Sequence, residues 1–388
     1  MRSAGSLNHY RLAVVVLAPV TLIAVVLLWP DGERESDLKF VTPTPTEKAE
    51  VESVQEIECQ VPVEDATCLE ASIRLKSGPN EGDLATLDVT SRSADTVVDP
   101  GDNIKVAAIS TDGGPTIYSL IDFERGPPLL LLAIAFTILV VLFGRLRGAL
   151  SLVGLAASLG IVLLFIIPAI LDKQPPLLVA LAGSMAVMLV TITLAHGVGP
   201  RSIAAILGTS VSLLLVGLLA VIFTSAANLT GFTSEEATLL SASDSGISIS
   251  GLVIAGIIIG ALGVLDDVTI SQASTVIALR AANPKQSIGR LYRRAIEVGR
   301  DHVSATVNTL VLAYVGSSLP VLLILGSGEV GLGRAVNMEI VAKEIVATLV
   351  GSIGLIAAVP ITTLLAALMS RSLDRAELAA EASHGHHH

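Results

Sequence analysis

Long apolar stretches recur along the chain, and they constrain its fold more than any other feature. Several reach about 18 residues or more, the length that a helix needs to cross a bilayer. The composition agrees, because 52% of the 388 residues are hydrophobic and only 15% are charged, whereas a soluble domain carries about 25% charged residues. The sequence therefore predicts an α-helical polytopic membrane protein with about eight transmembrane helices. The expected spans cover residues 12–29, 128–144, 150–171, 177–195, 202–223, 247–265, 303–325 and 345–369.

Basic residues give these spans an expected orientation. They occur before the first span, in every second connection, and after the last span. Lys and Arg in short loops favour the cytoplasmic side, so we expect a multi-pass membrane protein with both termini cytoplasmic. Residues 1–30 read as an anchor helix rather than a cleaved signal peptide, because the apolar core is long and is not followed by an A-x-A-like site.

Residues 31–126 have a different composition and predict a small extracytoplasmic β-rich domain between the first and second spans. Short runs such as VESVQEIECQV, CLEASIRLK, ATLDVTS and NIKVAAIS alternate with turn signals such as SGPNEGD and DPGDN, which is typical of β-strands joined by tight loops. We expect about five strands in a barrel or sandwich. The domain is either a passive structural cap or a module that binds a ligand or partner, and the lack of a chemistry-bearing cluster favours the cap.

The only two cysteines of the sequence, Cys59 and Cys68, both lie in this expected outer domain. This usage predicts one disulfide formed in an oxidising compartment. A metal site would need further ligands, and no histidine lies nearby in the sequence.

The stretch GALGVLDDVTISQAS, residues 260–274, contains the most informative polar residues of the membrane part. Asp266 and Asp267 end an apolar segment, where carboxylates are costly unless something binds them. On a helix, Asp267 would share one face with Ser271 and Ser274. Adjacent acids with oxygen neighbours suit a proton relay or a hard cation such as Mg²⁺ or Ca²⁺. The identity of any bound cation stays open, and no other cofactor is expected.

Two structural alternatives exist for this acid pair. Asp266 and Asp267 could cap a new helix at the cytoplasmic interface, or they could pair with the arginines that follow. A single helix over 247–280 would be about 50 Å long, which exceeds the roughly 30 Å of the hydrocarbon core. The helix therefore either projects into the cytoplasm or breaks near residues 263–267, where freed carbonyls could assist cation binding.

Other polar residues of the spans are secondary candidates. Asn308 and Asp301 lie on one polar stripe of the seventh span, and Asn308 is either a wall of the acidic site or a contact between helices. Tyr314 continues this stripe. His196, at the inner end of the fourth span, can titrate near neutral pH or lie plainly at the interface. The i, i+4 spacing of Glu339 and Lys343 predicts a helix-surface ion pair.

Four motifs together resemble the YibE/F family of bacterial multi-pass membrane proteins, which are predicted permeases. These motifs are the stretch containing the acid pair, AHGVGPRSIAAILGTSVSL (195–213), GRDHVSATVNTLVLAYVGSSLPVLLIL (299–325) and EIVATLVGSIGLIAAVPITTLLAA (344–367). The resemblance implies a multi-pass protein of the bacterial cell (plasma) membrane. It also implies a seven-helix domain over residues 127–370, followed by a cytoplasmic tail at 371–388. In many relatives the first acidic position is apolar or small, so the resemblance supports Asp267 more than Asp266.

Enzyme motifs are missing from the sequence, which contains no Walker A loop, no H-E-x-x-H and no G-x-S-x-G. We expect neither an enzyme nor a nucleic-acid-binding protein. One expected function is a permease for a small ion or solute, working as a secondary transporter with a cation- or proton-linked site near Asp267. The alternative is a non-transporting scaffold or sensor whose outer domain binds a partner. A second membrane subunit or a homo-oligomer is compatible with either function.

Overall fold

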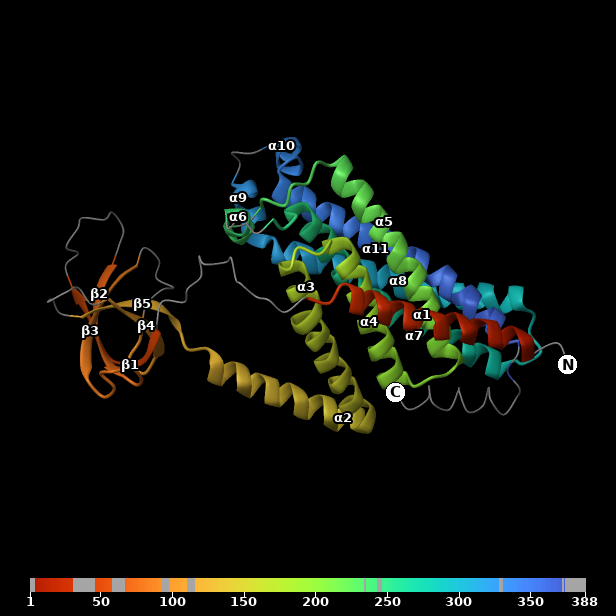
Figure 1. Cartoon of the computed structure of the whole chain (residues 1–388), viewed down its shortest axis with the longest axis horizontal. Helices are drawn as coiled ribbons and strands as arrows, with labels where there is room; N and C mark the ends of the chain where they lie inside the picture. Colours follow the sequence, from red (N-terminus) through yellow and green to blue (C-terminus); the bar gives the residue numbers. More distant parts are fainter. Residues whose placement is uncertain are drawn as a thin grey trace. The chain divides into compact units, whose positions relative to one another are not determined.

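The computed structural model describes two compact units of the chain. It describes residues 4–30, 46–57, 67–91, 98–109, 116–233, 235–242, 246–327, 331–371 and 373. One unit, residues 39–142, contains all five strands, and the other combines residues 1–38 with residues 143–388 and is helical (Figure 1).

The strands form a closed barrel in the order β1-β2-β3-β5-β4. Neighbouring strands are antiparallel, except for β3 and β5, which run parallel. Alternate residues point inward, as Ala71, Ile73 and Leu75 of β2 illustrate by their burial. The prediction of a small β-domain is confirmed, and the barrel replaces the sandwich alternative. The strands are Thr46–Ile57 (β1), Thr67–Leu75 (β2), Leu84–Ser91 (β3), Asn103–Ile109 (β4) and Ile117–Phe123 (β5).

Cys68 lies at the start of β2, where its side chain is buried. It takes part in a disulfide. Cys59, the only other cysteine of the sequence, lies outside the described residues, so the pairing of these two cysteines stays a prediction.

Helices make up the rest of the described chain. The principal ones are α1 (Ala4–Leu27), α2 (Gly126–Ile161), α4 (Pro176–His196), α5 (Pro200–Ala226), α7 (Ile249–Ala282), α8 (Ile288–Ser317) and α11 (Glu339–Met369). Shorter elements connect them: the π-helical turn η3 (Val162–Ile166), α3 (Ile167–Leu171), α6 (Glu235–Ala242), α9 (Leu319–Gly326) and α10 (Leu332–Val336).

Six helices in the described residues are long and apolar enough to cross a membrane, and the pair α8–α9, bent by 69°, raises the number to at most seven. The expected count of eight is therefore not confirmed. The predicted second and third spans are joined in one helical stretch, Gly126–Leu171. Arg145 interrupts this stretch with a non-helical backbone (φ 51°, ψ −133°), at the position where the basic residues predict a loop.

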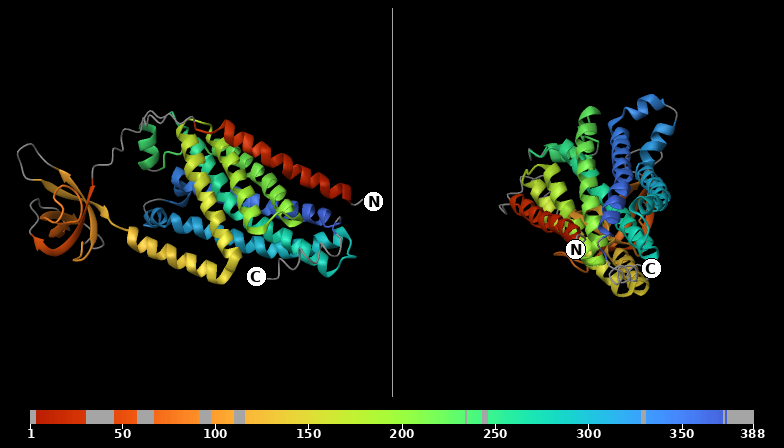
Figure 2. Two further views of the ribbon diagram at one scale, coloured as in Figure 1. Left: turned by 60° about the horizontal axis from the view of Figure 1, so that its bottom comes forward. Right: turned by 90° about the vertical axis from the view of Figure 1, so that its right-hand side faces the viewer.

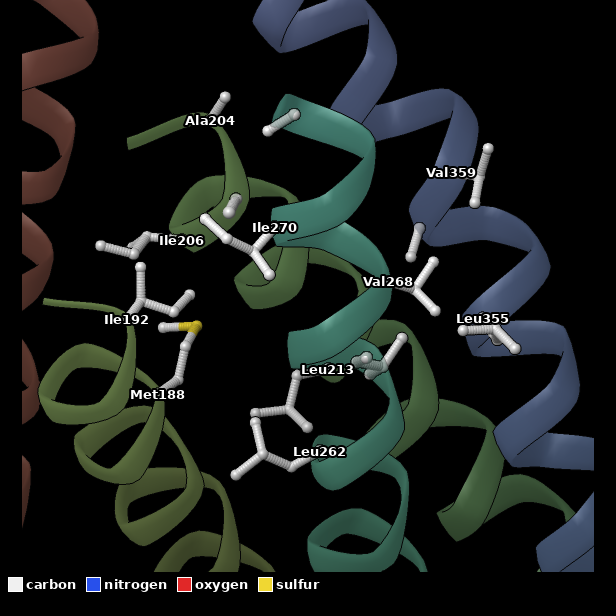
Figure 3. Close-up of a cluster of buried hydrophobic side chains, with 14 of the residues drawn as sticks. Met188, Ile192, Ala204, Ile206, Leu213, Leu262, Val268, Ile270, Leu355 and Val359 are labelled. Atoms are coloured by element: carbon white, nitrogen blue, oxygen red, sulfur yellow. The ribbon is translucent and has the colours of Figure 1, made fainter. Parts of the chain in front are cut away.

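The core of the helical unit lies between α4, α5, α7 and α11, with α8 packed beside them. Met188 of α4, Leu213 of α5 and Leu355 of α11 are fully buried there, and Figure 3 shows such side chains meeting between these helices. Glycines allow the close approach that membrane helices favour. A Cβ on Gly208 of α5 would lie 2.0 Å from Thr362 Oγ1 of α11, and one on Gly354 would lie 2.2 Å from Val216 Cγ2.

The first helix packs on the outside of this bundle. Most of its apolar side chains are exposed, but Tyr10, Val14 and Leu17 contact the core. At its end the ring of Trp29 stacks on Phe165 of η3, with 5.8 Å between ring centroids. Figure 2 shows α1 along the outside of the bundle in both views. This helix is thus part of the helical unit rather than a separate tether.

Candidate functional site

The acid pair lies in the middle of a continuous helix. α7 runs unbroken for 34 residues from Ile249 to Ala282, which is about 51 Å at 1.5 Å per residue. Its N-cap is Ser248, whose hydroxyl accepts a hydrogen bond from the Gly251 N–H. The capping alternative is therefore wrong, because Asp266 and Asp267 begin no helix, and the alternative of a break near residues 263–267 is wrong as well.

Both carboxylates line a half-open cavity of about 470 Å³ in the helical unit. Its walls come from the second half of α2 with η3, from α4 and from α7. Most of the lining is apolar. The polar side chains beside the two aspartates are Ser151 and Ser158 of α2 and Ser184, Thr191 and His196 of α4. Two acids, several hydroxyls and one imidazole therefore share one cavity among membrane-type helices.

Asp266 is tied to the neighbouring helix α4. Its Oδ2 accepts a hydrogen bond from Thr191 Oγ1 at 2.8 Å. Its Oδ1 is buried and accepts no hydrogen bond from any described residue, and the buried Ser184 hydroxyl in the same cavity also lacks a partner there. Buried polar atoms are nearly always satisfied in native proteins, so unsatisfied atoms lining a cavity indicate a place for water, a proton or a ligand.

Asp267 has a more open environment than Asp266. Its side chain is exposed, and no salt bridge within the described part of the chain involves either aspartate. The partner that acts on it electrostatically is His302 of α8. The alternative in which Asp267 pairs with an arginine finds no such pair among the described residues.

A π-helical turn also lines the cavity. Val162 and Ile166, the two ends of η3, both line the cavity. Gly183 of α4 makes room for this turn, because a Cβ there would lie 2.5 Å from Ile166 Cδ1. Single π-helical turns inside α-helices are rare and are frequent at functional sites.

Buried hydrogen bonds close to the acid pair hold α7 against its neighbouring helices. Thr269 Oγ1 lies 2.6 Å from Thr209 Oγ1 of α5. One turn further, Gln272 Nε2 donates to the Ala295 carbonyl of α8 at 2.9 Å and to Thr363 Oγ1 of α11 at 2.7 Å. These contacts hold α7 against three helices, so the positions of Asp266 and Asp267 are set by the whole bundle.

The other predicted site residues lie in different places. His196 lines the same cavity as the acid pair. Ser271 and Ser274 are half-buried and do not line it, and the Ser271 hydroxyl donates to the Val268 carbonyl. Asn308 and Asp301 are exposed on α8, away from the cavity lining. Tyr314 lines a second cavity of about 370 Å³, beside the first half of α7.

Sequence reasoning missed Thr191, Ser184 and His302. Thr191 is one hydroxyl in an apolar span, 75 residues from Asp266, and nothing local marks it. His302 lies in the quoted motif GRDHVSATVNTL, but its position opposite Asp267 depends on how α7 and α8 pack.

The chemistry of the first cavity is that of carboxylates and hydroxyls. No group of three or more His, Cys, Asp or Glu that could hold a metal ion occurs within the described ranges. Two carboxylates with hydroxyl neighbours can bind a proton or a cation that keeps part of its hydration shell.

Comparison with known proteins gives one match. A family model described as "YibE/F-like protein" matches residues 132–372, which include every residue lining the first cavity but not the barrel. No curated protein and no solved structure matches the chain.

Proposed function

The chain belongs to the YibE/F family of membrane proteins, and on this premise we propose that it is a permease of the bacterial cell membrane. In this proposal it works as a secondary transporter of a small ion or solute, and the pair Asp266–Asp267 takes up and releases a proton or cation. The observation that carries the proposal is the cavity of about 470 Å³ into which both carboxylates open.

The contacts of the acid pair support different roles for its atoms. Asp266 Oδ2 already accepts the Thr191 hydroxyl, so Oδ1 is the atom that receives the proton or cation. Asp267 lines the same cavity and is exposed, so in this proposal it exchanges a proton or cation with water. Charged groups inside membrane proteins commonly mark ion pathways and proton relays.

The decisive experiment is flux through the purified protein in liposomes, with a panel of ions and a pH gradient. Asp266→Asn and Asp267→Asn keep the size of the side chain and remove its charge. We expect each variant to lose ion-dependent or proton-dependent flux while still folding. Asp301→Asn, on the exposed part of α8, is the matched control and should keep the flux of the wild type. Full activity of both cavity variants would sink the proposal.

A second candidate function rests on the barrel. It has its own open cavity of about 400 Å³, with mainly polar lining that includes Asn80, Asp83, Thr86 and Tyr118. In this alternative the helices anchor a sensor whose barrel binds a ligand or partner. Absence of flux for every ion and solute tested, together with ligand binding to the barrel, would favour it over the permease.

The proposed orientation places both termini in the cytoplasm and the barrel outside. Glu81 and Lys285 are exposed in the structure, so a cysteine at either position reports sidedness rather than burial. We expect a membrane-impermeant thiol reagent to label Glu81→Cys in intact cells and to label Lys285→Cys only after the membrane is opened. The reverse pattern would overturn the orientation.

A further inference from the structure

The second cavity of the helical unit contains charged groups that the proposed function does not use. It measures about 370 Å³ and lies between the first half of α7, the short helix α6 and the start of α11. Most of its lining is apolar, with side chains such as Leu240, Leu252 and Ile257. The polar side chains are Thr233, Tyr314, Lys343 and Glu344. Its volume falls in the range of about 300–1,000 Å³ that is usual for small-molecule sites.

The natural helix partner of Lys343 is engaged elsewhere. The predicted i, i+4 pair of Glu339 and Lys343 forms no direct salt bridge: Lys343 acts on Glu339 only at longer range, and its ammonium pairs with Glu344. Glu339 instead accepts hydrogen bonds from the Thr230 hydroxyl at 2.7 Å and from the Gly231 N–H at 2.5 Å.

The loop that Glu339 binds contains a glycine whose backbone conformation suits its close contact with α7. Gly231 has a positive φ of +86°, and a Cβ there would lie 2.7 Å from Ile249 Cγ2. Only glycine meets both requirements without strain. Gly231 and Thr233 of this loop line the cavity together with Lys343, whose ammonium donates to the Thr233 hydroxyl.

Lys343 and Glu344 are only loosely paired with each other. Adjacent residues on a helix point about 100° apart and do not face each other, and their charged atoms are 3.4 Å apart. The other contact of the ammonium, to Thr233 Oγ1, is also long at 3.4 Å. The side chains keep 32% and 26% of their surface exposed. Each charge can therefore accept a better-placed partner from a ligand.

We propose that this cavity binds a small zwitterionic solute with an apolar body. Its carboxylate pairs with Lys343, its ammonium pairs with Glu344, and its apolar part lies against the side chains of α6 and α7. A ligand with one charge of each sign satisfies both groups, whereas a ligand with a single charge leaves one of them unmatched. This site is separate from the acid pair, and its existence does not depend on transport.

Equilibrium binding to the full-length protein in lipid nanodiscs tests this proposal. Labelled leucine is the probe, and two analogues compete with it: isoamylamine, which lacks the carboxylate, and 4-methylpentanoate, which lacks the ammonium. We expect leucine to bind about tenfold or more tightly than either analogue, because each analogue loses one charge pair. If leucine did not bind, or if one analogue bound as tightly as leucine, the proposal would be overturned. This comparison needs only the wild-type protein.

Two variants test which charged group of leucine each side chain binds. Lys343→Gln should bring leucine binding down to that of isoamylamine, and Glu344→Gln should bring it down to that of 4-methylpentanoate. The matched controls are Lys285→Gln and Glu297→Gln, which remove exposed charges outside the cavity and should bind leucine like the wild type. Unchanged binding in both cavity variants would place leucine elsewhere and contradict the proposal. The acid-pair variant Asp266→Asn should still bind leucine, which separates this result from the test of proton-linked transport.

Discussion

Thr191 is the only described side chain that donates a hydrogen bond to the Asp266 carboxylate. We expect Thr191→Val to lower ion-dependent flux about tenfold or more, since a hydrogen bond to a charged group contributes about 1.5–3 kcal/mol. Thr191→Ser keeps the donor and should keep most of the flux. Liposome flux measures both, and Thr193→Val on the exposed side of α4 is the control. Equal flux in the wild type and Thr191→Val would show that this contact has no role in transport.

Gly208 shows how tightly the core helices approach. Gly208→Ala would place a Cβ 2.0 Å from Thr362 Oγ1 and 3.3 Å from Thr362 Cα, so the backbones of α5 and α11 must separate. We expect a loss of about 1–3 kcal/mol in the free energy of unfolding, as is usual for an overpacked core. Unfolding by SDS in mixed micelles measures this loss. Gly160→Ala, with no atom within 4 Å of the added Cβ, should be neutral or slightly stabilising, and a similar loss there would contradict the packing explanation.

Single residues were predictable from the sequence where their chemistry conflicts with their surroundings. Asp266 and Asp267 could be found because carboxylates are rare in apolar segments. Thr191 and Ser184 could not, because hydroxyls are common in membrane helices and only the packing of α4 on α7 turns them toward the cavity. Asn308 was expected near the acid pair, but helical periodicity does not fix which face of α8 meets α7.

At the scale of elements, Gln272 links α7 to two other helices. Its amide donates to Thr363 of α11 and to the Ala295 carbonyl of α8. We expect a double-mutant cycle of Gln272→Leu with Thr363→Val to give a coupling of about 0.6 kcal/mol and at most about 1.7 kcal/mol, the average and the maximum found for such hydrogen bonds between membrane helices. The control cycle pairs Thr363→Val with Thr275→Val, whose hydroxyl bonds within its own helix, and should be additive. If both cycles were additive, the hydrogen bond between Gln272 and Thr363 would make no contribution to the free energy of unfolding.

The positions of the helices could be predicted from hydropathy, but some of their ends could not. The expected spans 177–195 and 202–223 correspond closely to α4 and α5. The expected span 247–265 stopped at the first charge, whereas α7 continues to Ala282. Its second half contains charged and polar residues, yet buried side chains such as Val268, Ala273 and Val276 keep it packed in the bundle. Hydropathy predicts which residues of a helix can lie in lipid. It does not predict where the helix ends, because that depends on backbone hydrogen bonds and on packing against other helices.

At the scale of the whole molecule, the barrel and the helical unit have separate cores. We expect Cys68→Ser to lower the stability of the barrel by about 2–3 kcal/mol. This is the chain-entropy value for the predicted Cys59–Cys68 disulfide, which would close a loop of about ten residues. The helical unit should be unaffected, because it has its own apolar packing. Limited proteolysis with mass mapping, over a temperature series, follows each unit separately. Reducing the disulfide of the wild-type protein should lower the stability of the barrel by a similar amount. If the variant were also cleaved within α4–α11 at a lower temperature than the wild type, the two units would not be independent.

The continuity of α7 also has a mechanical consequence. A helix of 34 residues without a proline or a break behaves as a stiff rod, so Asp266 and the Gln272 anchor move together and keep their spacing. We therefore expect a change in the width of the first cavity to come from its other walls. One of them contains η3, where the wider π-helical hydrogen-bonding pattern replaces the α-helical one. α7 is then the fixed wall that carries both carboxylates, and η3 is the segment where we expect the backbone hydrogen bonds to rearrange.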